Sequence, residues 1–299
     1  MNAILYYLSL PFIYLVSLLP FRLLYLLSDL LFVLVFHLIG YRKEVVRNNL
    51  RNAFPEKGEE EIRQISRKFY RSFCDLTLES LKNLTISAAG LKQFILFEDT
   101  SLFQKYKAEN QSIVIVLGHI GNWELAGPRF SLEPIHTLYV VYHPLSNPYF
   151  EKLVYRMRTR LGMHLYTMKN TFRGMVENRG QCTATAFIAD QTPSARNTYW
   201  MEFLHQDTAV FTGPGRLAKR FKYPVVYIAI NRLRRGKYRI ESELLAEKPE
   251  ALTEEQITGL YIRRLEKDIR ARPESWLWTH RRWKRSRTPG SDGPLSSVP

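Results

Sequence analysis

The chain has 299 residues, 45% of them hydrophobic, and its lysines and arginines outnumber its aspartates and glutamates by 43 to 28. This length allows one large domain with an additional segment, or two small domains, and the hydrophobic content excludes a globally disordered chain. The formal net charge of +15 suits nucleic acid, anionic lipid or an acidic protein as a partner.

The first forty residues are predicted to form a membrane anchor. Residues 1–21 carry no charged side chain, and a second apolar run at 23–40 contains Asp29 and no Glu, Lys or Arg. The first run has the roughly 20 residues that a helix needs to cross a bilayer core. A cleaved signal peptide is not expected, because no lysine or arginine precedes this run and no small-residue cleavage site follows it.

The topology of this segment is left open between two arrangements. Either the first helix spans the membrane and the second is interfacial, or both lie half-submerged in one face of the bilayer. Pro11 and Pro20 interrupt the first run, which favours the second arrangement. A buried hairpin of a soluble protein is the remaining alternative. The positive-inside rule places the chain after the anchor in the cytoplasm, because the flank contains Arg42, Lys43, Arg47 and Arg51.

The basic residues follow an apolar segment and are not accompanied by a zinc-finger spacing or an RNA-recognition signature, so no nucleic acid partner is expected. Helices are predicted at 42–53 and 59–83 from the spacing of their apolar residues. Further on, candidate strands lie at 94–97, 112–117, 137–142, 183–188, 225–230 and 238–242. Candidate helices lie between them at 123–131, 148–161, 170–179, 213–221 and 253–271. This alternation predicts an α/β fold, a mixed sheet flanked by helices. The tail at 286–299 is rich in Pro, Gly and Ser and is expected to be disordered.

One motif carries candidate chemistry, VIVLGHIGNWELAG at 114–127. An apolar strand leads into Gly118 and His119, and Asn122 can cap a helix that begins at Trp123. His119 and Glu124 are five positions apart, so on one continuous helix they would point about 140° away from each other. They can meet only if the chain turns between them, and a strand–turn–helix supplies that turn.

A histidine next to a carboxylate is suited to general-base catalysis. A neutral imidazole takes the proton of a hydroxyl that attacks an acyl carbonyl, which accelerates the reaction about 10²–10⁴-fold. A carboxylate on the other ring nitrogen fixes the tautomer and stabilises the imidazolium. His119 is therefore predicted as the base and Glu124 as its orienting carboxylate, although a capped helix with an exposed polar histidine explains the bare spacing equally well. No cluster has the spacing of metal ligands, so no metal and no cofactor are expected.

Several blocks resemble the lipid A biosynthesis acyltransferase family, which belongs to the glycerolipid and lysophospholipid acyltransferase superfamily. GHIGNWE at 118–124 is similar to the first family motif. In the expected order, blocks similar to its arginine, Asp-centred, Gly-Pro and C-terminal tryptophan segments follow at 147–162, 187–192, 211–232 and 273–284. Together with the anchor, the resemblance covers nearly the whole chain.

The resemblance implies an acyltransferase domain over 41–285 at the cytoplasmic face of the bacterial inner membrane. It implies acyl carrier protein as the donor, with acyl-CoA not excluded, and a lipid A precursor of lipopolysaccharide biosynthesis as the acceptor. Direct attack without an acyl-enzyme is expected, since neither Cys74 nor Cys182 lies near the motif. A lysophospholipid, an aminolipid or a glycolipid is the alternative acceptor. A non-catalytic membrane lipid-binding protein is the alternative of another class.

The resemblance also implies binding residues. Arg158, four residues before Gly162, matches the family arginine, and Arg156 and Arg160 are close enough to compete for that role. A guanidinium there would bind a phosphate of the acceptor or of the carrier's pantetheine arm. Asn122 and Asp190 complete the predicted set, with Asp190 equally readable as a turn residue after a strand. The tryptophans and arginines at 276–285 are expected to form a belt at the membrane interface.

Overall fold

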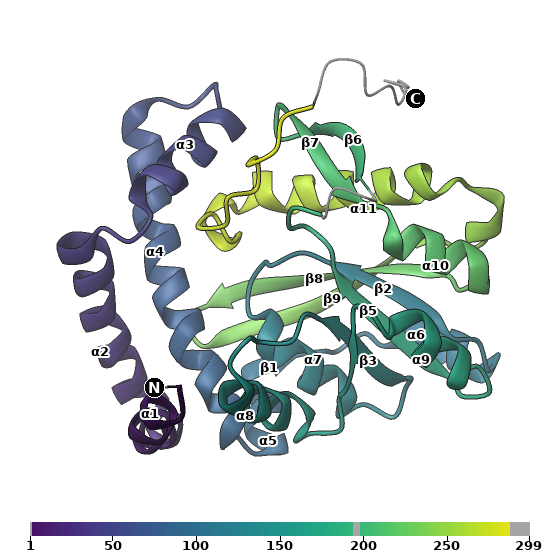
Figure 1. Ribbon diagram of the computed structural model, residues 1–299, viewed down its shortest axis with the longest axis horizontal. Coiled ribbons are helices and arrows are strands. Elements are labelled where there is room, and N and C mark those ends of the chain that lie inside the picture. Colours follow the sequence, from purple (N-terminus) through teal and green to yellow (C-terminus); the bar gives the residue numbers. More distant parts are fainter. Residues whose placement is uncertain (1, 194–197, 288–299) are drawn as a thin grey trace.

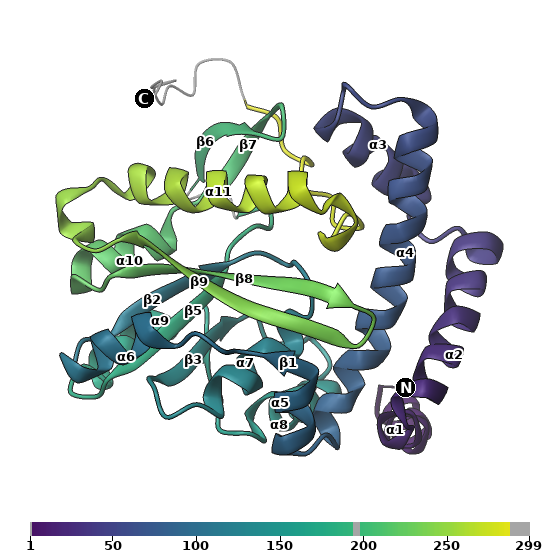
Figure 2. The same cartoon turned by 180° about the vertical axis from the view of Figure 1, so that it is seen from behind.

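The computed structural model describes residues 2–193 and 198–287, and in this part of the chain seven strands form one mixed sheet between two layers of helices (Figures 1 and 2). The strand order is β1-β9-β8-β2-β5-β3-β4, and only the β8–β9 pair is antiparallel. The strands are β1 (Ile95–Leu96), β2 (Ile113–Leu117), β3 (Thr137–Tyr142), β4 (His164–Thr167), β5 (Thr183–Ile188), β8 (Val225–Arg234) and β9 (Lys237–Ala246). The predicted mixed α/β fold is confirmed.

Strand β2 shows how the sequence divides the core into two layers. All five of its residues are buried, and successive side chains point to opposite faces of the sheet. Val114 and Val116 pack in the cluster that contains α10 (Gly213–Phe221) and α11 (Glu254–Ala271). Ile113, Ile115 and Leu117 pack in the other cluster, with helices α5 (Ala88–Phe94), α6 (Ser101–Ala108) and α7 (Trp123–Ser131). Each fully buried side chain of this size contributes about 1.5–3 kcal/mol.

The N-terminal segment folds into two helices beside the long helix α4 (Glu59–Leu81), reached through α3 (Lys43–Ala53) (Figure 1). Helix α1 (Asn2–Leu18) contains Pro11 without breaking, and Pro20 precedes α2 (Phe21–Phe32), which continues as a π-helix over Val33–Ile39. In the described residues, one helix is long and apolar enough to cross a membrane, Phe21–Ile39. Pro20 starts a new helix and leaves α1 with 17 residues, so the helix that is long enough to cross a membrane lies in the second apolar run.

Helix α2 has two distinct faces. Its inner face contacts α4, where Ser28 donates a hydrogen bond to Asp75 at 2.6 Å and Tyr25 donates one to Glu79 at 2.8 Å. Its outer face exposes large apolar side chains, and only 17% of the apolar window is buried. The helix therefore fits a membrane anchor that is also joined to the rest of the chain by polar contacts.

Most predicted elements are confirmed, and the differences lie where periodicity is weak. The structure places strands at 137–142 and 183–188 and helices at 123–131 and 213–221, as predicted. Strands β8 and β9 are longer than expected because they form a hairpin that extends beyond the sheet. The elements that the sequence analysis missed are β4, α5, α6 and the hairpin of β6 (Thr198–Phe203) and β7 (Gln206–Phe211). The predicted disordered tail falls largely on residues 288–299, which lie outside the described residues.

Candidate active site

His119 and Asp190 meet at one edge of the sheet. His119 follows β2 and Asp190 follows β5, and these two strands are parallel neighbours, so their carboxyl ends lie side by side. The ring nitrogen Nδ1 of His119 is 2.5 Å from Oδ1 of Asp190. The backbone N–H of His119 donates a second hydrogen bond to Oδ2 at 2.8 Å. One carboxylate therefore fixes both the ring and the backbone of the histidine.

Asp190 is buried and ionised. Burial would raise the pKa of its carboxyl group, but His119 and the indole N–H of Trp276, which donates at 2.8 Å, outweigh that effect and lower the pKa to about 2. An ionised partner on Nδ1 requires that Nδ1 carries the proton. The hydrogen-bond network thus assigns the tautomer in which Nε2 of His119 is the free basic nitrogen.

Two glycines allow the chain to pass closely beneath this pair. A Cβ atom at Gly118 would lie 2.4 Å from Cδ1 of Leu265 and 3.2 Å from Oδ2 of Asp190. Gly121 has a φ of +62°, and a Cβ atom there would lie 2.3 Å from the carbonyl oxygen of Ile230. Gly121 therefore requires glycine both for steric reasons and for its backbone conformation, whereas a side chain at Gly118 would require Leu265 to move.

The structure corrects the predicted role of Glu124. Its carboxylate pairs with Arg158, whose Nε and Nη2 donate to it at 3.0 Å and 2.5 Å. Among the described residues no hydrogen bond joins Glu124 to His119. The reason is topological: Glu124 lies in the first turn of α7, where the arginine of helix α8 (Pro148–Thr159) engages it, whereas Asp190 reaches the ring from the neighbouring strand. Burial would lower the pKa of Arg158, but the hydrogen bonds and charge of Glu124 outweigh it and raise that pKa.

The other predicted binding residues have different positions. Arg160 donates to the backbone carbonyls of Asn83 and Ile86. Arg156 is exposed on α8 and does not line the cavity described below. Asn122 is buried, accepts a hydrogen bond from the N–H of Leu125 at 3.0 Å and donates one to Glu79 at 2.9 Å. The asparagine therefore caps α7, as its position in the motif predicted, and its amide has no place on the cavity wall.

A cavity of about 570 Å³ begins at His119 and extends between the sheet and α7. The polar part of its lining includes the Glu124–Arg158 pair and Gln191. Side chains of the apolar core also line the cavity: Ile115, Leu117, Ala126, Phe130, Leu138, Ile228 and Ile240. A pocket with a few polar groups and apolar walls is suited to a ligand with one reactive end and a hydrocarbon chain. Residues 2–193 and 198–287 contain no group of three or more His, Cys, Asp and Glu side chains that could hold a metal ion.

The C-terminal block completes the site instead of forming an interfacial belt. Trp276 and Trp278 are 3% and 0% exposed, and the predicted belt is therefore wrong for them. Their segment folds back over the turn after β2, where Trp276 forms a β-bridge with Ile120 and donates to Asp190. The spacing of residues around Trp276 does not indicate this contact. The sequence offers only the general rule that a buried indole N–H needs a hydrogen-bond acceptor.

The fold and this site define a class of protein. A family model described as bacterial lipid A biosynthesis acyltransferase matches residues 1–285, and the chain belongs to this family. It is 24% identical over 283 residues to the lipid A biosynthesis lauroyltransferase of Escherichia coli (strain K12), covering 93% of this chain and 90% of that protein. It is 22% identical over 245 residues to the palmitoleoyltransferase of the same organism, covering 81% and 79%. A lipid A biosynthesis acyltransferase of Haemophilus influenzae is 22% identical over 280 residues, covering 91% and 85%. Membership supports acyl transfer in lipid A biosynthesis.

Proposed function

We propose that this chain transfers a fatty-acyl chain from acyl carrier protein to a hydroxyl group of a lipid A precursor, with His119 as general base and Asp190 as its orienting carboxylate. The observation that carries the proposal is the His119–Asp190 pair at one end of an apolar cavity of about 570 Å³. The cavity receives the acyl chain and presents its thioester carbonyl to the histidine.

The reaction follows from the assigned tautomer. Nε2 of His119 accepts the proton of the acceptor hydroxyl as its oxygen bonds to the thioester carbonyl carbon. The ionised Asp190 stabilises the imidazolium that forms. The tetrahedral intermediate then breaks its C–S bond, and the proton passes from Nε2 to the leaving thiolate. The N–H groups of Trp123 and Glu124, at the start of α7, are assigned to the developing oxyanion.

Arg158 is assigned to the phosphate of the carrier's pantetheine arm. It lines the cavity near His119, and guanidinium groups bind phosphate through two parallel hydrogen bonds. Glu124 holds the guanidinium in one orientation through its own bidentate pair. Glu124 thus keeps a place in the site, as a positioning residue for Arg158.

Residues 1–40 serve in this proposal as an anchor on the cytoplasmic face of the inner membrane, and residues 41–285 as the catalytic unit. The polar contacts of Tyr25 and Ser28 with α4 support a half-submerged anchor, because a helix that crosses the bilayer would have to give them up. The acidic carrier protein would be attracted by the basic surface of the chain.

The proposal is tested with full-length protein in detergent, an acyl carrier protein thioester and a lipid A precursor. His119→Ala is expected to lower kcat by at least about 10³-fold, because the base is lost. His164→Ala, an exposed histidine outside the cavity lining, is the matched control and should retain normal turnover. Near-normal turnover of a folded His119→Ala variant would exclude His119 as the base, whereas no turnover by the wild type with either donor would favour a non-catalytic lipid-binding protein. A coenzyme A thioester run in parallel distinguishes the two donors.

A further inference from the structure

A second cleft, strongly basic, lies between the anchor and the edge of the sheet. Its volume is about 760 Å³, and it is lined by parts of α2 and its π-helical extension, α4, the β8–β9 turn and residues 272–275. Within the described residues, seven lysine and arginine side chains face three carboxylates on its walls. The excess of positive charge is therefore concentrated in a concave site, separate from the catalytic cavity.

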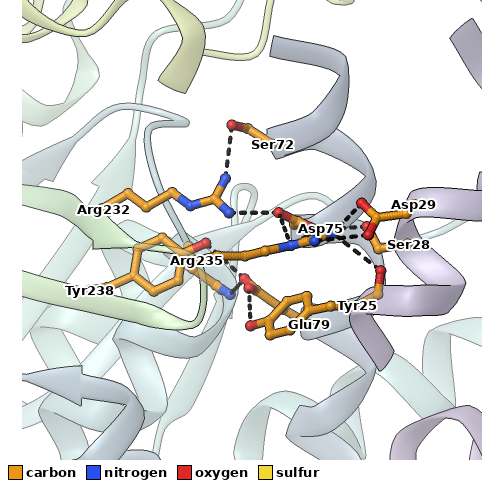
Figure 3. A network of polar contacts seen from close by, with 10 residues as sticks. Tyr25, Ser28, Asp29, Ser72, Asp75, Glu79, Arg232, Arg235 and Tyr238 are labelled. Atoms are coloured by element: carbon orange, nitrogen blue, oxygen red, sulfur yellow. Dashed lines mark hydrogen bonds and ion pairs between the residues drawn. The ribbon is translucent and has the colours of Figure 1, made fainter. Parts of the chain in front are cut away.

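The floor of the cleft is a fixed network of ion pairs. Arg232 donates to Asp75 at 2.6 Å, and Arg235 bridges Asp75 and Asp29 at 2.7 Å and 2.8 Å. Figure 3 shows the two arginines extending from the β8–β9 hairpin toward the carboxylates of α4 and α2. These pairs satisfy the inner cations and hold the hairpin, α2 and α4 together.

The outer cations have no such partner. Arg67, Lys68, Arg71 and Arg234 are exposed and make no ion pair with any carboxylate in the described part of the chain. Arg71 only lies over the ring of Phe32, 5.1 Å from its centroid. Four unpaired cations above a neutralised floor are suited to an anion with several oxygens, because each oxygen can accept from a different side chain.

The position of the cleft indicates which kind of molecule brings that anion. Phe32 and Val33 of the anchor form part of its wall, and the exposed side of the same helix is apolar, with Leu30 and Leu38 at the surface. A helix lying in the membrane interface would place the cleft at the level of the lipid headgroups. A folded carrier protein would need a broad, accessible face, whereas this site is concave and adjoins the membrane anchor.

The basic cleft also leads toward the catalytic residues. Ser72, Arg232 and Glu274 line both this cleft and a smaller one, whose opposite wall includes Gly121 and Trp123. The ring of Trp123 lies 5.0 Å from that of His119, centroid to centroid, and also lines the acyl cavity. The basic cleft is therefore connected through shared lining residues to Trp123, which also forms part of the wall of the acyl cavity.

We propose that the basic cleft binds a phosphate group of the acceptor lipid and so directs the acceptor hydroxyl toward His119. This inference rests on the proposed function, because it assigns the acceptor of the same reaction. It divides the two substrates between two entrances, with the acyl chain in the apolar cavity and the phosphorylated headgroup beside the anchor.

The test removes two unpaired cations from one helix turn. Arg67→Gln/Arg71→Gln on α4 is compared with Arg263→Gln/Lys267→Gln on α11, a pair with the same spacing, exposed and without an ion pair to described carboxylates. Kinetics are measured on full-length protein in detergent with a diphosphorylated lipid A precursor and with the same lipid after phosphatase treatment. The α4 variant should raise the acceptor KM about 10- to 30-fold at nearly unchanged kcat, and the α11 variant should not. On the dephosphorylated lipid, wild type and α4 variant should have the same KM.

Four outcomes would overturn the inference. A rise in the KM for the carrier thioester instead of the acceptor would show that the cleft meets the protein donor. An equal loss on the dephosphorylated lipid would show a structural effect. If the His119→Ala variant bound phosphatidylglycerol micelles as tightly as the precursor, the cleft would be assigned to bulk anionic lipid. If inorganic phosphate alone displaced the precursor from this variant, the cleft would bind phosphate without needing a lipid. Because that background is inactive, specific binding of the precursor would support the cleft even if acyl transfer itself were disproved.

Discussion

Two buried carboxylates, Asp190 and Glu79, show how different surroundings give the same group opposite properties. They are 2% and 0% exposed. Asp190 faces a histidine, which can take up a positive charge, and its pKa falls to about 2. Burial raises the pKa of Glu79, and the hydroxyl groups of Tyr25 and Tyr238, which donate to it at 2.8 Å, together with the charge of Arg232 counteract this only in part. The two acids differ because Asp190 is in direct contact with the histidine, whereas Arg232 forms its ion pair with Asp75 and not with Glu79.

The two carboxylates consequently serve different purposes. In the proposed mechanism Asp190 is part of a proton-transfer pair. Glu79 connects three elements, since it accepts from Tyr25 of the anchor, from Asn122 of the catalytic motif and from Tyr238 of β9 (Figure 3 shows the two tyrosines). A neutral acid or an amide can fulfil that second role, whereas the first requires a negative charge.

The largest expected effect is that of Asp190→Asn. The amide leaves the geometry nearly unchanged but no longer fixes the productive tautomer or stabilises the imidazolium, so kcat should fall about 10²–10⁴-fold. Activity of the purified variant and its thermal melting are measured together. A loss of less than tenfold in a folded protein would mean that Asp190 is a structural residue like Glu79 and that the comparison fails.

A smaller effect is expected for Glu124→Gln. Its carboxylate holds Arg158 and does not touch His119, so kcat should fall about 10-fold or less while the KM for the carrier thioester rises. Arg158→Ala should show the same KM effect, and the double variant should add little because the two residues act as a pair. A loss with Glu124→Gln that exceeds the loss with Asp190→Asn would restore Glu124 as the partner of the histidine.

The acid dependence of stability should separate the two carboxylates. The pKa of Asp190 is depressed from 3.8 to about 2, so its stabilising contribution is complete above pH 3.8 and is lost as the pH falls toward 2, about 2 kcal/mol in total. The pKa of Glu79 is raised, so ionisation of that group costs stability above its folded pKa and the cost disappears as the pH falls. Melting curves of wild type, Asp190→Asn and Glu79→Gln between pH 2 and 7 should therefore show differences that change in opposite directions.

The smallest effect is expected for Glu79→Gln at neutral pH. Glutamine keeps one oxygen for Asn122 and Tyr238, and its amide nitrogen can donate to the Tyr25 hydroxyl, which then accepts instead of donating. Because the change also removes a desolvated charge, unfolding should be unchanged or slightly less favourable and kcat should stay within about threefold. Glu79→Ala is the contrasting variant, which leaves the three donors without an acceptor and should lower the melting temperature. A collapse of activity in a well-folded Glu79→Gln variant would assign Glu79 to catalysis.

Much of the fold could be predicted because local sequence signals indicate β2 and α7. These signals are a fully apolar strand, a turn with glycines and an asparagine that caps the helix. His119 could be selected for the same reason. Its partner could not, because the choice between Glu124 and Asp190 depends on which strands are neighbours in the sheet. Five residues separate His119 from one candidate and 71 from the other, and only the sheet order makes the distant one closer.

The position of Trp276 could not be predicted for the same reason, because its partner Ile120 is distant in the sequence. A tryptophan near basic residues is typical of a membrane interface, and nothing near it in the sequence indicates that it will pair with Ile120. The hairpin β6–β7 was missed because its strands mix polar and apolar residues. Long-range contacts, more than secondary structure, set the limit of the sequence analysis.

The bridge between Ile120 and Trp276 also determines when, during protein synthesis, the site can be completed. His119 and Asp190 are both synthesised before Trp276, so Asp190 receives its indole donor only after the strands that carry the pair have been made. Truncated translation products that end before residue 276 would carry the histidine but not the finished pocket.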